Sequence, residues 1–341
     1  MRTIRWMSLL LILALLTGCA GQGKREQKAE RELFAMDTYM TVTCYGPQAE
    51  DACDDAEAEI RRLDALLSVG NPDSEVSAIN AAGGGELTAD TKALMETALS
   101  MWQATSGAFD VTIYPLMTLW GFPTGDFSVP DGETLADMRA HVGCDQLVYD
   151  PPTGTLTLAP GQGVDFGGIA KGYTSDRLGE VFAAYDLTGA IVSLGGNVCV
   201  YGEKPDGKPW RCGIQDPFAA DGGRTLLGVL TAEDVSVITS GAYERFFTDE
   251  QGNVYHHILD PATGYPADSD LASVTIVSKS GIEADCLSTA CYVMGRERAA
   301  DLWRQSGASF DMILMTRDGT VYVTEPLRGS FTTDYPLRII Q

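Results

Sequence analysis

The middle of the chain reads Gly163-Val164-Asp165-Phe166-Gly167-Gly168-Ile169-Ala170-Lys171-Gly172-Tyr173-Thr174-Ser175-Asp176. It passes from a carboxylate, Asp165, through two glycines to a lone cation, Lys171, at the predicted start of a helix over residues 171–185. Glycines let the backbone approach a ligand closely, and a helix start offers free N–H groups and positive partial charge. The stretch therefore suits a phosphate or pyrophosphate, provided that the charge of Asp165 is offset. A strand-to-helix turn with a structural salt bridge explains the same residues, because short glycine-rich motifs are weak evidence alone.

Strand and helix patterns are mixed on both sides of this stretch. Apolar residues alternate over residues 33–45, which predicts one strand, and recur at helical spacing over residues 49–67. A glycine-rich hinge loop is predicted at residues 83–85. The remaining patterns predict helices over residues 89–105, 131–142, 282–294 and 297–306, and strands over residues 147–149, 155–158, 189–202, 210–215, 225–231, 235–240, 271–278, 310–316 and 320–324. Because strands and helices do not alternate regularly, the pattern favours an α+β fold over a doubly wound sheet. No repeat or long linker follows residue 33, so we expect one domain over residues 33–341, with a cleft between two lobes.

The composition is that of a globular and strongly acidic protein. Of 341 residues, 45% are hydrophobic and 21% are charged, and the formal net charge is −23. This balance argues against a nucleic-acid partner, because phosphate backbones need a basic surface. An acidic protein that binds a phosphate ligand usually needs a metal ion or a local cation.

The N-terminus has the pattern of a bacterial lipoprotein signal. Arg2 and Arg5 precede an apolar run over residues 9–16, which is too short for an ordinary membrane-spanning helix. The run ends in Leu16-Thr17-Gly18-Cys19, which resembles a lipobox. We therefore expect a signal peptide over residues 1–18, lipidation of Cys19 and a polar tether over residues 19–32. The expected protein is exported and anchored to the cell membrane by lipid, facing outside the cytoplasm; a plain signal peptide with a coincidental cysteine is the alternative.

Seven further cysteines remain, and an odd number cannot all pair. No C-x-x-C pattern occurs, which argues against a zinc or redox site. Several lie in apolar segments, where cysteine behaves as a small buried hydrophobe.

Asp285 and Thr289 are four residues apart in a predicted helix, so both side chains lie on one face. A carboxylate and a hydroxyl form an oxygen pair suited to Mg²⁺, which keeps few protein ligands and bridges to phosphate. The alternative is a purely structural role, with an acid near the helix N-terminus and a buried threonine bonded to its own backbone.

Two of the three histidines, His256 and His257, are adjacent at a strand end before the turn at residues 260–264. Because neighbours in a strand point to opposite faces, one of them can face a cleft and act as a general base. A hydrogen-bonded turn histidine is the commoner role.

Taken together, the motifs resemble those of the ApbE family of FAD:protein FMN transferases. They run in the family's order over roughly residues 33–330. They are Met36-Asp37-Thr38, Asp73-Ser74-Glu75, Gly107-Ala108-Phe109-Asp110, Asp165–Gly172 as quoted above, Ser193-Leu194-Gly195-Gly196-Asn197, Thr239-Ser240-Gly241, His257-Ile258-Leu259-Asp260-Pro261-Ala262-Thr263-Gly264 and Ala284-Asp285-Cys286-Leu287-Ser288-Thr289-Ala290.

The resemblance implies a single ApbE-like, T-fold-related domain that binds FAD as substrate and Mg²⁺. Such an enzyme transfers FMN to a Thr or Ser hydroxyl of an acceptor protein, forms a phosphoester and releases AMP. It implies Asp285, Thr289 and the carbonyl of Gly168 as metal ligands and His257 as the base, with Lys171 beside the pyrophosphate or at the base of its helix. The residues implied to line the FAD site are Met36, Ala108, Phe109, Asp110, Asp165, Lys171 and Leu259.

The resemblance leaves several alternatives open. The same site can hydrolyse FAD to FMN and AMP, and a flavin-binding lipoprotein without chemistry would need the pocket but not the metal pair or His257. The implied acceptor is a flavoprotein domain of a membrane or extracellular reductase. One departure is Asp37, where the family usually has glycine; we expect it to alter flavin affinity or strand geometry without abolishing activity.

Overall fold

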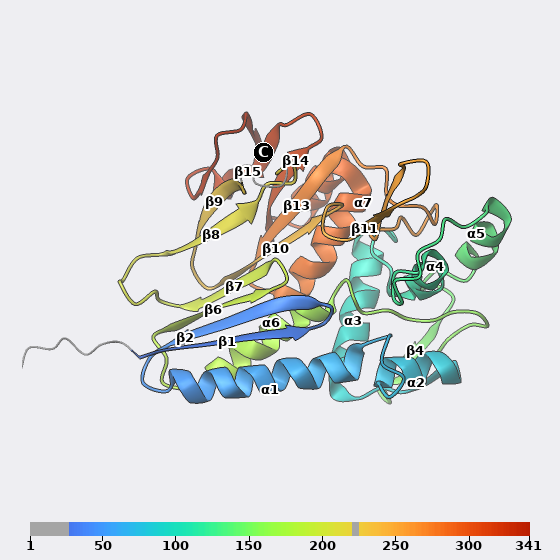
Figure 1. The fold of residues 1–341 in the computed structure, drawn as a ribbon, viewed down its shortest axis with the longest axis horizontal. Helices are drawn as coiled ribbons and strands as arrows, with labels where there is room; N and C mark the ends of the chain where they lie inside the picture. The colour runs from blue at the N-terminus through green and yellow to red at the C-terminus, as the bar shows by residue number, and fades with distance from the viewer. Residues whose placement is uncertain (1–26, 220–224) are drawn as a thin grey trace, which may run out of the picture.

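The computed structural model describes residues 27–219 and 225–341. Its centre is a nine-stranded mixed sheet in the order β1-β2-β6-β7-β10-β13-β14-β15-β17 (Figure 1). All neighbouring strands are antiparallel except β15 and β17. The strands are β1 (Lys28–Ala35), β2 (Thr38–Tyr45), β6 (Gly189–Leu194), β7 (Asn197–Gly202), β10 (Val235–Gly241), β13 (Leu271–Ser278), β14 (Asp311–Thr316), β15 (Val321–Thr324) and β17 (Leu337–Ile340).

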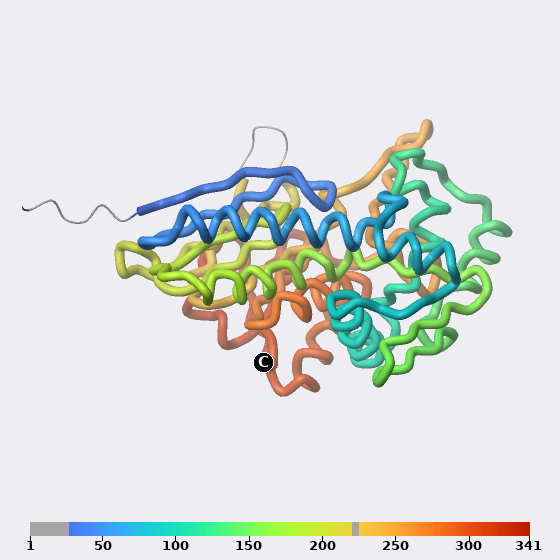
Figure 2. The backbone as a smooth tube through the Cα atoms, turned by 90° about the horizontal axis from the view of Figure 1, so that it is seen from below, coloured from blue at the N-terminus to red at the C-terminus, as the bar shows by residue number. Residues whose placement is uncertain are grey.

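Helices cover one face of this sheet. The main ones are α1 (Ala49–Leu67), α3 (Ala89–Ala104), α6 (Ala170–Phe182) and α7 (Gly281–Gln305). Figure 2 shows α1 and α6 lying along the sheet together. The buried side of α1 includes Ile60, Leu63 and Leu67, at the spacing that brings side chains to one helix face. This predicted helix is confirmed from residue 49 to residue 67.

A second sheet covers the other face, in the order β16-β9-β8. It consists of β8 (Trp210–Gln215), β9 (Leu226–Ala232) and β16 (Phe331–Thr332). Side chains along the central strands point alternately toward the helices and toward the second sheet. Ile238 packs with residues of α7, whereas Val237 packs with β8 and β9. The central strands of the main sheet are therefore buried on both faces.

A smaller lobe lies beside the end of the main sheet. It contains α2 (Glu75–Ala82), η1 (Val111–Ile113), α4 (Tyr114–Trp120), α5 (Gly132–Arg139), the hairpin β11 (Phe246–Thr248) and β12 (Val254–His256), and the small sheet β3 (Gly84–Glu86), β5 (Thr155–Thr157) and β4 (Val148–Asp150). Trp120 is fully buried, and its indole N–H donates to the carbonyl of Gly264 at 2.9 Å. This bond joins α4 to the loop that follows His257.

The chain forms one α+β domain of mixed sheets and helices, as predicted, but four details differ. Residues 33–45 form a hairpin rather than one strand, because Met36 and Asp37 both have positive φ (49° and 58°) and close a two-residue turn. The structured domain begins earlier than residue 33, because β1 starts at Lys28, so the predicted tether is too long. Residues 84–86 form a strand and not a hinge loop. Residues 189–202, predicted as one strand, form the β6–β7 hairpin, because Gly195 and Gly196 have positive φ (62° and 100°) and close a turn between the two strands. The two predicted C-terminal helices are confirmed: they lie within α7 on either side of Gly295, where φ is 77° and ψ is 170°.

The seven cysteines after Cys19 are free and buried. Cys19, the signal peptide and most of the predicted tether lie outside the described residues. Within the described residues, no helix has the length and hydropathy needed to cross a membrane.

Candidate active site

The site is built around Asp285, in the second turn of α7. The start of α7 is fixed by Asp176 of α6, whose carboxylate accepts from the N–H groups of Gly281 (2.7 Å) and Ile282 (3.0 Å). Asp285 is buried, and its two oxygens accept from the side-chain amide of Asn197 (3.1 Å) and the N–H of Gly172 (2.8 Å). Three elements, β7, α6 and α7, therefore orient one carboxylate, and each oxygen keeps a lone pair for another partner.

Gly172 is required for this arrangement. A Cβ atom at this position would lie 2.2 Å from the carbonyl oxygen of Gly281 and 2.6 Å from the Cβ of Asp285. Any side chain would thus separate α6 from α7 and break the bond to Asp285. The glycine that follows Lys171 in the sequence motif is explained by this close contact between helices.

Thr289 lies one turn after Asp285 and is half-buried. A helical threonine commonly bonds back to the carbonyl four residues before it, but Ser288 donates to that carbonyl of Asp285 instead (2.8 Å). The Thr289 hydroxyl has no hydrogen-bond partner among the described residues. A Cβ built on Gly168 would lie 3.8 Å from it, so the structure brings the Gly168 backbone next to Thr289. The three positions predicted to hold a metal therefore meet.

This oxygen set contains only one carboxylate. In agreement, the described ranges contain no cluster of three or more His, Cys, Asp or Glu residues placed to hold a metal. A set of one carboxylate, one uncommitted hydroxyl and one carbonyl fits Mg²⁺, which accepts few protein ligands when phosphate oxygens complete its shell.

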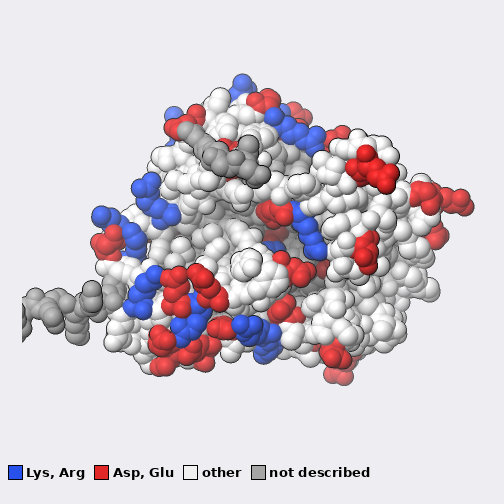
Figure 3. All heavy atoms as spheres, viewed as in Figure 1, with Lys and Arg blue, Asp and Glu red and all other residues white. Residues whose placement is uncertain are grey.

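Lys171 is the second residue of α6 and is half-buried. Its ammonium group makes neither an ion pair nor a hydrogen bond within residues 27–219 and 225–341. Beside the larger effect of burial, its positive charge acts to lower the pKa of Asp165, Glu244 and His257, so these three side chains lie near Lys171. The face shown in Figure 3 has a hollow near its centre, with basic and acidic side chains at its edge. A lysine at a helix start that has no ionic partner among the described residues is suited to an anionic ligand.

His257 directly follows β12 and is held by a single backbone carbonyl. The carbonyl oxygen of Arg245 accepts from the N–H of His257 at 3.0 Å and lies 3.1 Å from its ring Nδ1. Nδ1 therefore carries the proton in the neutral ring, which leaves the Nε2 lone pair free. Burial in the cleft wall lowers the pKa of His257 to about 4, and the charge of Lys171 adds to this shift. His256 points the other way and is buried with its ring edge against Tyr292.

The turn of the β1–β2 hairpin forms another part of the wall. Met36 is half-buried; its N–H donates to Asp64 (2.9 Å), and its sulfur accepts from the Thr174 hydroxyl of α6 (3.8 Å). Asp37 lies 3.9 Å from the guanidinium of Arg245, and this guanidinium also donates to the carbonyl of Phe122. The turn therefore contacts both α6 and the residue that holds His257.

The remaining predicted flavin-site residues differ in how deeply they are buried. Asp165 is half-buried, its carboxylate accepts from the N–H of Gly167 (2.8 Å), and burial raises its pKa. Phe109 is buried, and its ring would lie 3.2 Å from a Cβ on Gly168.

Ala108, Asp110 and Leu259 are buried too, and two of them have clear structural contacts. Asp110 accepts from the N–H and hydroxyl of Thr112 (2.8 and 2.6 Å) and from Cys144, so it holds its own loop in shape. The Leu259 side chain packs in the core of the smaller lobe. A direct role of these side chains toward FAD stays a prediction.

Three residues of the site were not predicted. Asn197 orients Asp285, Arg245 holds His257, and the pKa of Glu244 is influenced by the charges of Lys171 and Asp285. The Glu244 side chain keeps contact with solvent, yet desolvation by the surrounding protein raises its pKa to about 7. Of these three residues, only Asn197 had a sequence signal, the Gly-Gly-Asn motif. Glu244 and Arg245 follow a glycine-containing strand end and belong to no recognisable spacing pattern.

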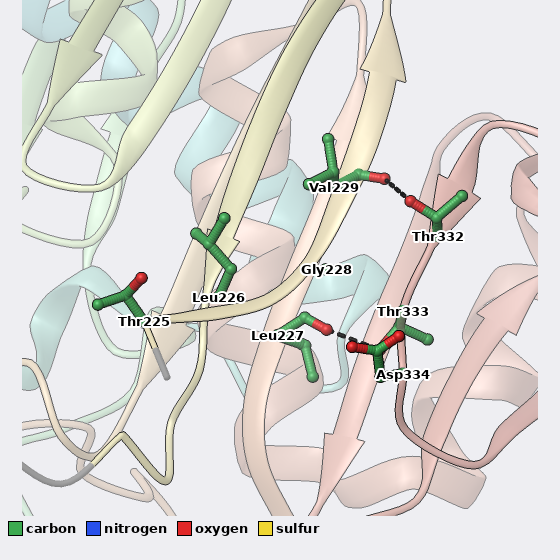
Figure 4. Close-up of a pocket in the computed structure, with 8 residues that line it drawn as sticks. All are labelled: Thr225, Leu226, Leu227, Gly228, Val229, Thr332, Thr333 and Asp334. Atoms are coloured by element: carbon green, nitrogen blue, oxygen red, sulfur yellow. Dashed lines mark hydrogen bonds between the residues drawn. The ribbon is translucent and has the colours of Figure 1, made fainter. Parts of the chain in front are cut away.

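A separate hollow of about 590 Å³ lies between β9 and the segment after β16 (Figure 4). There Thr332 and Thr333 donate to the carbonyls of Val229 (3.3 Å) and Leu227 (2.6 Å). These bonds join the strands of the smaller sheet, and the hollow shares no residue with the cleft. We assign it no chemistry.

The fold and site place the chain among proteins of the ApbE class. The model of the ApbE family matches residues 36–314, and the chain belongs to this family. It is 34% identical to the FAD:protein FMN transferase of Treponema pallidum over 319 residues, with 87% of each chain covered. It is 35% identical to an FAD:protein FMN transferase of Klebsiella pneumoniae over 280 residues, which cover 80% of this chain and 84% of the relative. The crystal structure of the ApbE protein of Thermotoga maritima superposes with a TM-score of 0.81 at 30% identity, covering 89% of this chain and 99% of that one.

Proposed function

We propose that the chain transfers the FMN part of FAD to a Thr or Ser hydroxyl of an acceptor protein. The observation that carries this proposal is the oriented carboxylate of Asp285 one helical turn from the Thr289 hydroxyl, which has no partner among the described residues. Lys171 directly precedes Gly172, whose N–H binds this carboxylate. A cation and an oxygen pair in one cleft are what a pyrophosphate substrate requires. The curated relatives bear the same activity in their names.

The residues that would hold Mg²⁺ are Asp285, Thr289 and the carbonyl of Gly168. When bound, the ion neutralises phosphate oxygens and stabilises the charge that develops on the leaving AMP. Lys171 supplies a second positive charge to the same pyrophosphate. Asn197 and the Gly172 N–H keep Asp285 in place, so that little reorganisation accompanies binding.

His257 would take the proton of the acceptor hydroxyl at Nε2. The hydroxyl oxygen forms a new bond to the phosphorus of the FMN moiety, and the bond from that phosphorus to the bridging oxygen breaks. AMP leaves with the bridging oxygen, and the acceptor keeps FMN as a phosphoester. A hydroxyl is a weak nucleophile until a base assists it, and the low pKa of His257 keeps the imidazole neutral at neutral pH.

The predicted lipid anchor would keep this cleft outside the cytoplasm, close to the membrane. The signal pattern of residues 1–19 is the support for this part of the proposal. An anchored enzyme suits acceptor domains of membrane or extracellular reductases, which would be tethered to the same surface.

The test is incubation with FAD, Mg²⁺ and the flavin-binding domain of a membrane reductase. Flavin fluorescence that stays on the acceptor after denaturation, with one AMP released per label, is the expected result. AMP without labelled acceptor would identify an FAD pyrophosphatase, and neither product would identify a flavin-binding protein. Asp285→Ala should abolish both products, whereas Asp318→Ala, in an exposed turn between β14 and β15, is the matched control.

A further inference from the structure

The closed end of the β1–β2 hairpin exposes a pair of aromatic side chains. Phe34 and Tyr39 are directly opposite in the strand register, and their rings meet edge to face at 5.3 Å. Tyr39 is 81% exposed, the highest value among the large hydrophobic residues described, and Phe34 is 57% exposed. Paired aromatic rings left in water on a sheet face are typical of a contact surface.

This pair lies beside the catalytic cleft. The turn that joins the two strands touches α6 through Met36 and Thr174, and reaches Arg245 through Asp37. Arg245 in turn holds His257, which would take the acceptor proton. A polypeptide lying against Phe34 and Tyr39 is thus beside the turn that contacts Arg245, the residue whose carbonyl holds His257.

The free edge of β1 supports the same site. β1 is the outermost strand of the main sheet, with β2 as its only neighbour among the described strands. Charged side chains occupy Lys28, Glu30, Arg31 and Glu32, and they protect this part of the edge against unwanted pairing. These charged side chains end before residues 33–35, which read Leu-Phe-Ala and lead into the turn at Met36 and Asp37. The turn makes Ala35–Thr38 and Leu33–Met40 the hydrogen-bonded pairs, so the N–H and C=O of Phe34 point away from β2 and can pair with an added strand.

We propose that this docking edge, formed by Phe34, Tyr39 and residues 33–35 of β1, receives the acceptor segment that carries the reacting Thr or Ser. The proposal rests on the proposed function. The segment binds in an extended conformation, with an apolar or aromatic side chain against the two rings. It lacks a run of acidic residues, because Glu32 and Asp37 flank the docking edge on a chain of net charge −23. The same two carboxylates disfavour an anionic lipid surface as the occupant.

The test compares the full chain with its Phe34→Ser/Tyr39→Ser double variant. Both side chains are largely in water, so folding should tolerate the change, and neither touches Lys171, Asp285 or His257 in the described contacts. We expect the KM for the acceptor domain to rise about tenfold, the range for truncated interface aromatics. The kcat at saturating acceptor and the Kd for FAD should stay unchanged. Val148→Ser on β4, where Val148 is 66% exposed, is the control and should change none of these.

An unchanged acceptor KM in the double variant would overturn the proposal. In that event, weaker binding to vesicles of phosphatidylcholine and phosphatidylglycerol would identify a membrane contact, and a change in sedimentation would identify self-association. Failure of the proposed function looks different, because the unmodified chain itself would then label no acceptor domain.

Discussion

The carbonyl oxygen of Arg245 lies 3.1 Å from Nδ1 of His257 and also accepts from the backbone N–H of that residue at 3.0 Å. One acceptor therefore fixes both the position and the tautomer of the imidazole. A ring held in this way directs Nε2 as the acceptor of a proton, and the fixed geometry has measurable consequences for catalysis.

The pH dependence of transfer should follow the depressed pKa of His257. Protonation removes the base, so activity is present above the pKa and is lost below it. Since burial lowers the pKa of His257 to about 4, kcat/KM should stay level from neutral pH to about pH 5 and fall through about pH 4. Stopped assays across this range measure the profile. An acid limb near the ordinary histidine value of about 6.5 would contradict the assignment.

His257→Gln should lower the transfer rate by about 10²–10⁴-fold, the usual contribution of a general base. The acid limb should disappear with it, while the Kd for FAD changes little. His256→Gln is the neighbouring control, since His256 faces Tyr292 and not the cleft. Equal losses in both variants would indicate a structural effect on the segment around residues 256–257.

Thr289→Val removes a hydroxyl that has no partner within the described residues and keeps the side-chain shape. Its effect on the free energy of unfolding should therefore be small, below about 1 kcal/mol. Affinity for Mg²⁺ in the presence of FAD should fall about tenfold or more, as expected for loss of a ligand. The control is Thr289→Ser, which keeps the hydroxyl and should bind Mg²⁺ nearly normally. Titration calorimetry measures the Mg²⁺ affinity of both variants. Equal Mg²⁺ affinity in Val and Ser variants would remove Thr289 from the ligand set.

Lys171→Met should separate stability from binding. The Lys171 side chain is half-buried and has no ion pair in the part of the chain that the structure describes, so the substitution should leave the melting temperature unchanged or raise it. Affinity for FAD should fall about tenfold or more, because a cation beside the pyrophosphate is lost. Lys279→Met, at an exposed position before α7, should alter neither quantity. A normal Kd for FAD in Lys171→Met would place the lysine at the base of its helix and away from the phosphates.

Gly172→Ala should destabilise the fold. Its Cβ would lie 2.2 Å from the carbonyl of Gly281, so α6 and α7 must separate, at a cost of about 1–3 kcal/mol or more. Denaturant titration measures the change. At Gly132, where a Cβ meets no atom within 4 Å, the same substitution should be neutral or slightly stabilising. A stable Gly172→Ala protein with normal activity would contradict the close contact between these helices.

Much of the architecture follows from local sequence patterns. The apolar periodicity of α1 is a local signal, and the structure agrees with it. The glycines at residues 195 and 196 were visible as an interruption, but the apolar residues on both sides of them favoured one strand where the structure has the β6–β7 hairpin. The β1–β2 hairpin was missed because its turn is Met36-Asp37, without the glycine that usually marks two left-handed residues; an aspartate tolerates this conformation and leaves the alternation of apolar residues unbroken.

The site was only partly predictable for a related reason. The spacing of Asp285 and Thr289 on one helix face is visible in the sequence. The orientation of Asp285 by Asn197, 88 residues earlier, depends on β7 lying beside α7, which no local pattern encodes. The shifted pKa values of His257 and Glu244 likewise arise from tertiary burial.

The tight junction of α6 and α7 also bears on how such a protein can diversify. Any residue larger than glycine at position 172 disturbs Asp285, and Asp176 binds the first turn of α7, so the phosphate half of the cleft tolerates little variation. The β1–β2 turn is linked to Arg245 by a solvent-exposed ion pair from Asp37, which contributes little to stability. If the docking edge proposed above receives the acceptor, sequence drift in that hairpin would redirect such an enzyme to new acceptors while the chemistry is inherited unchanged.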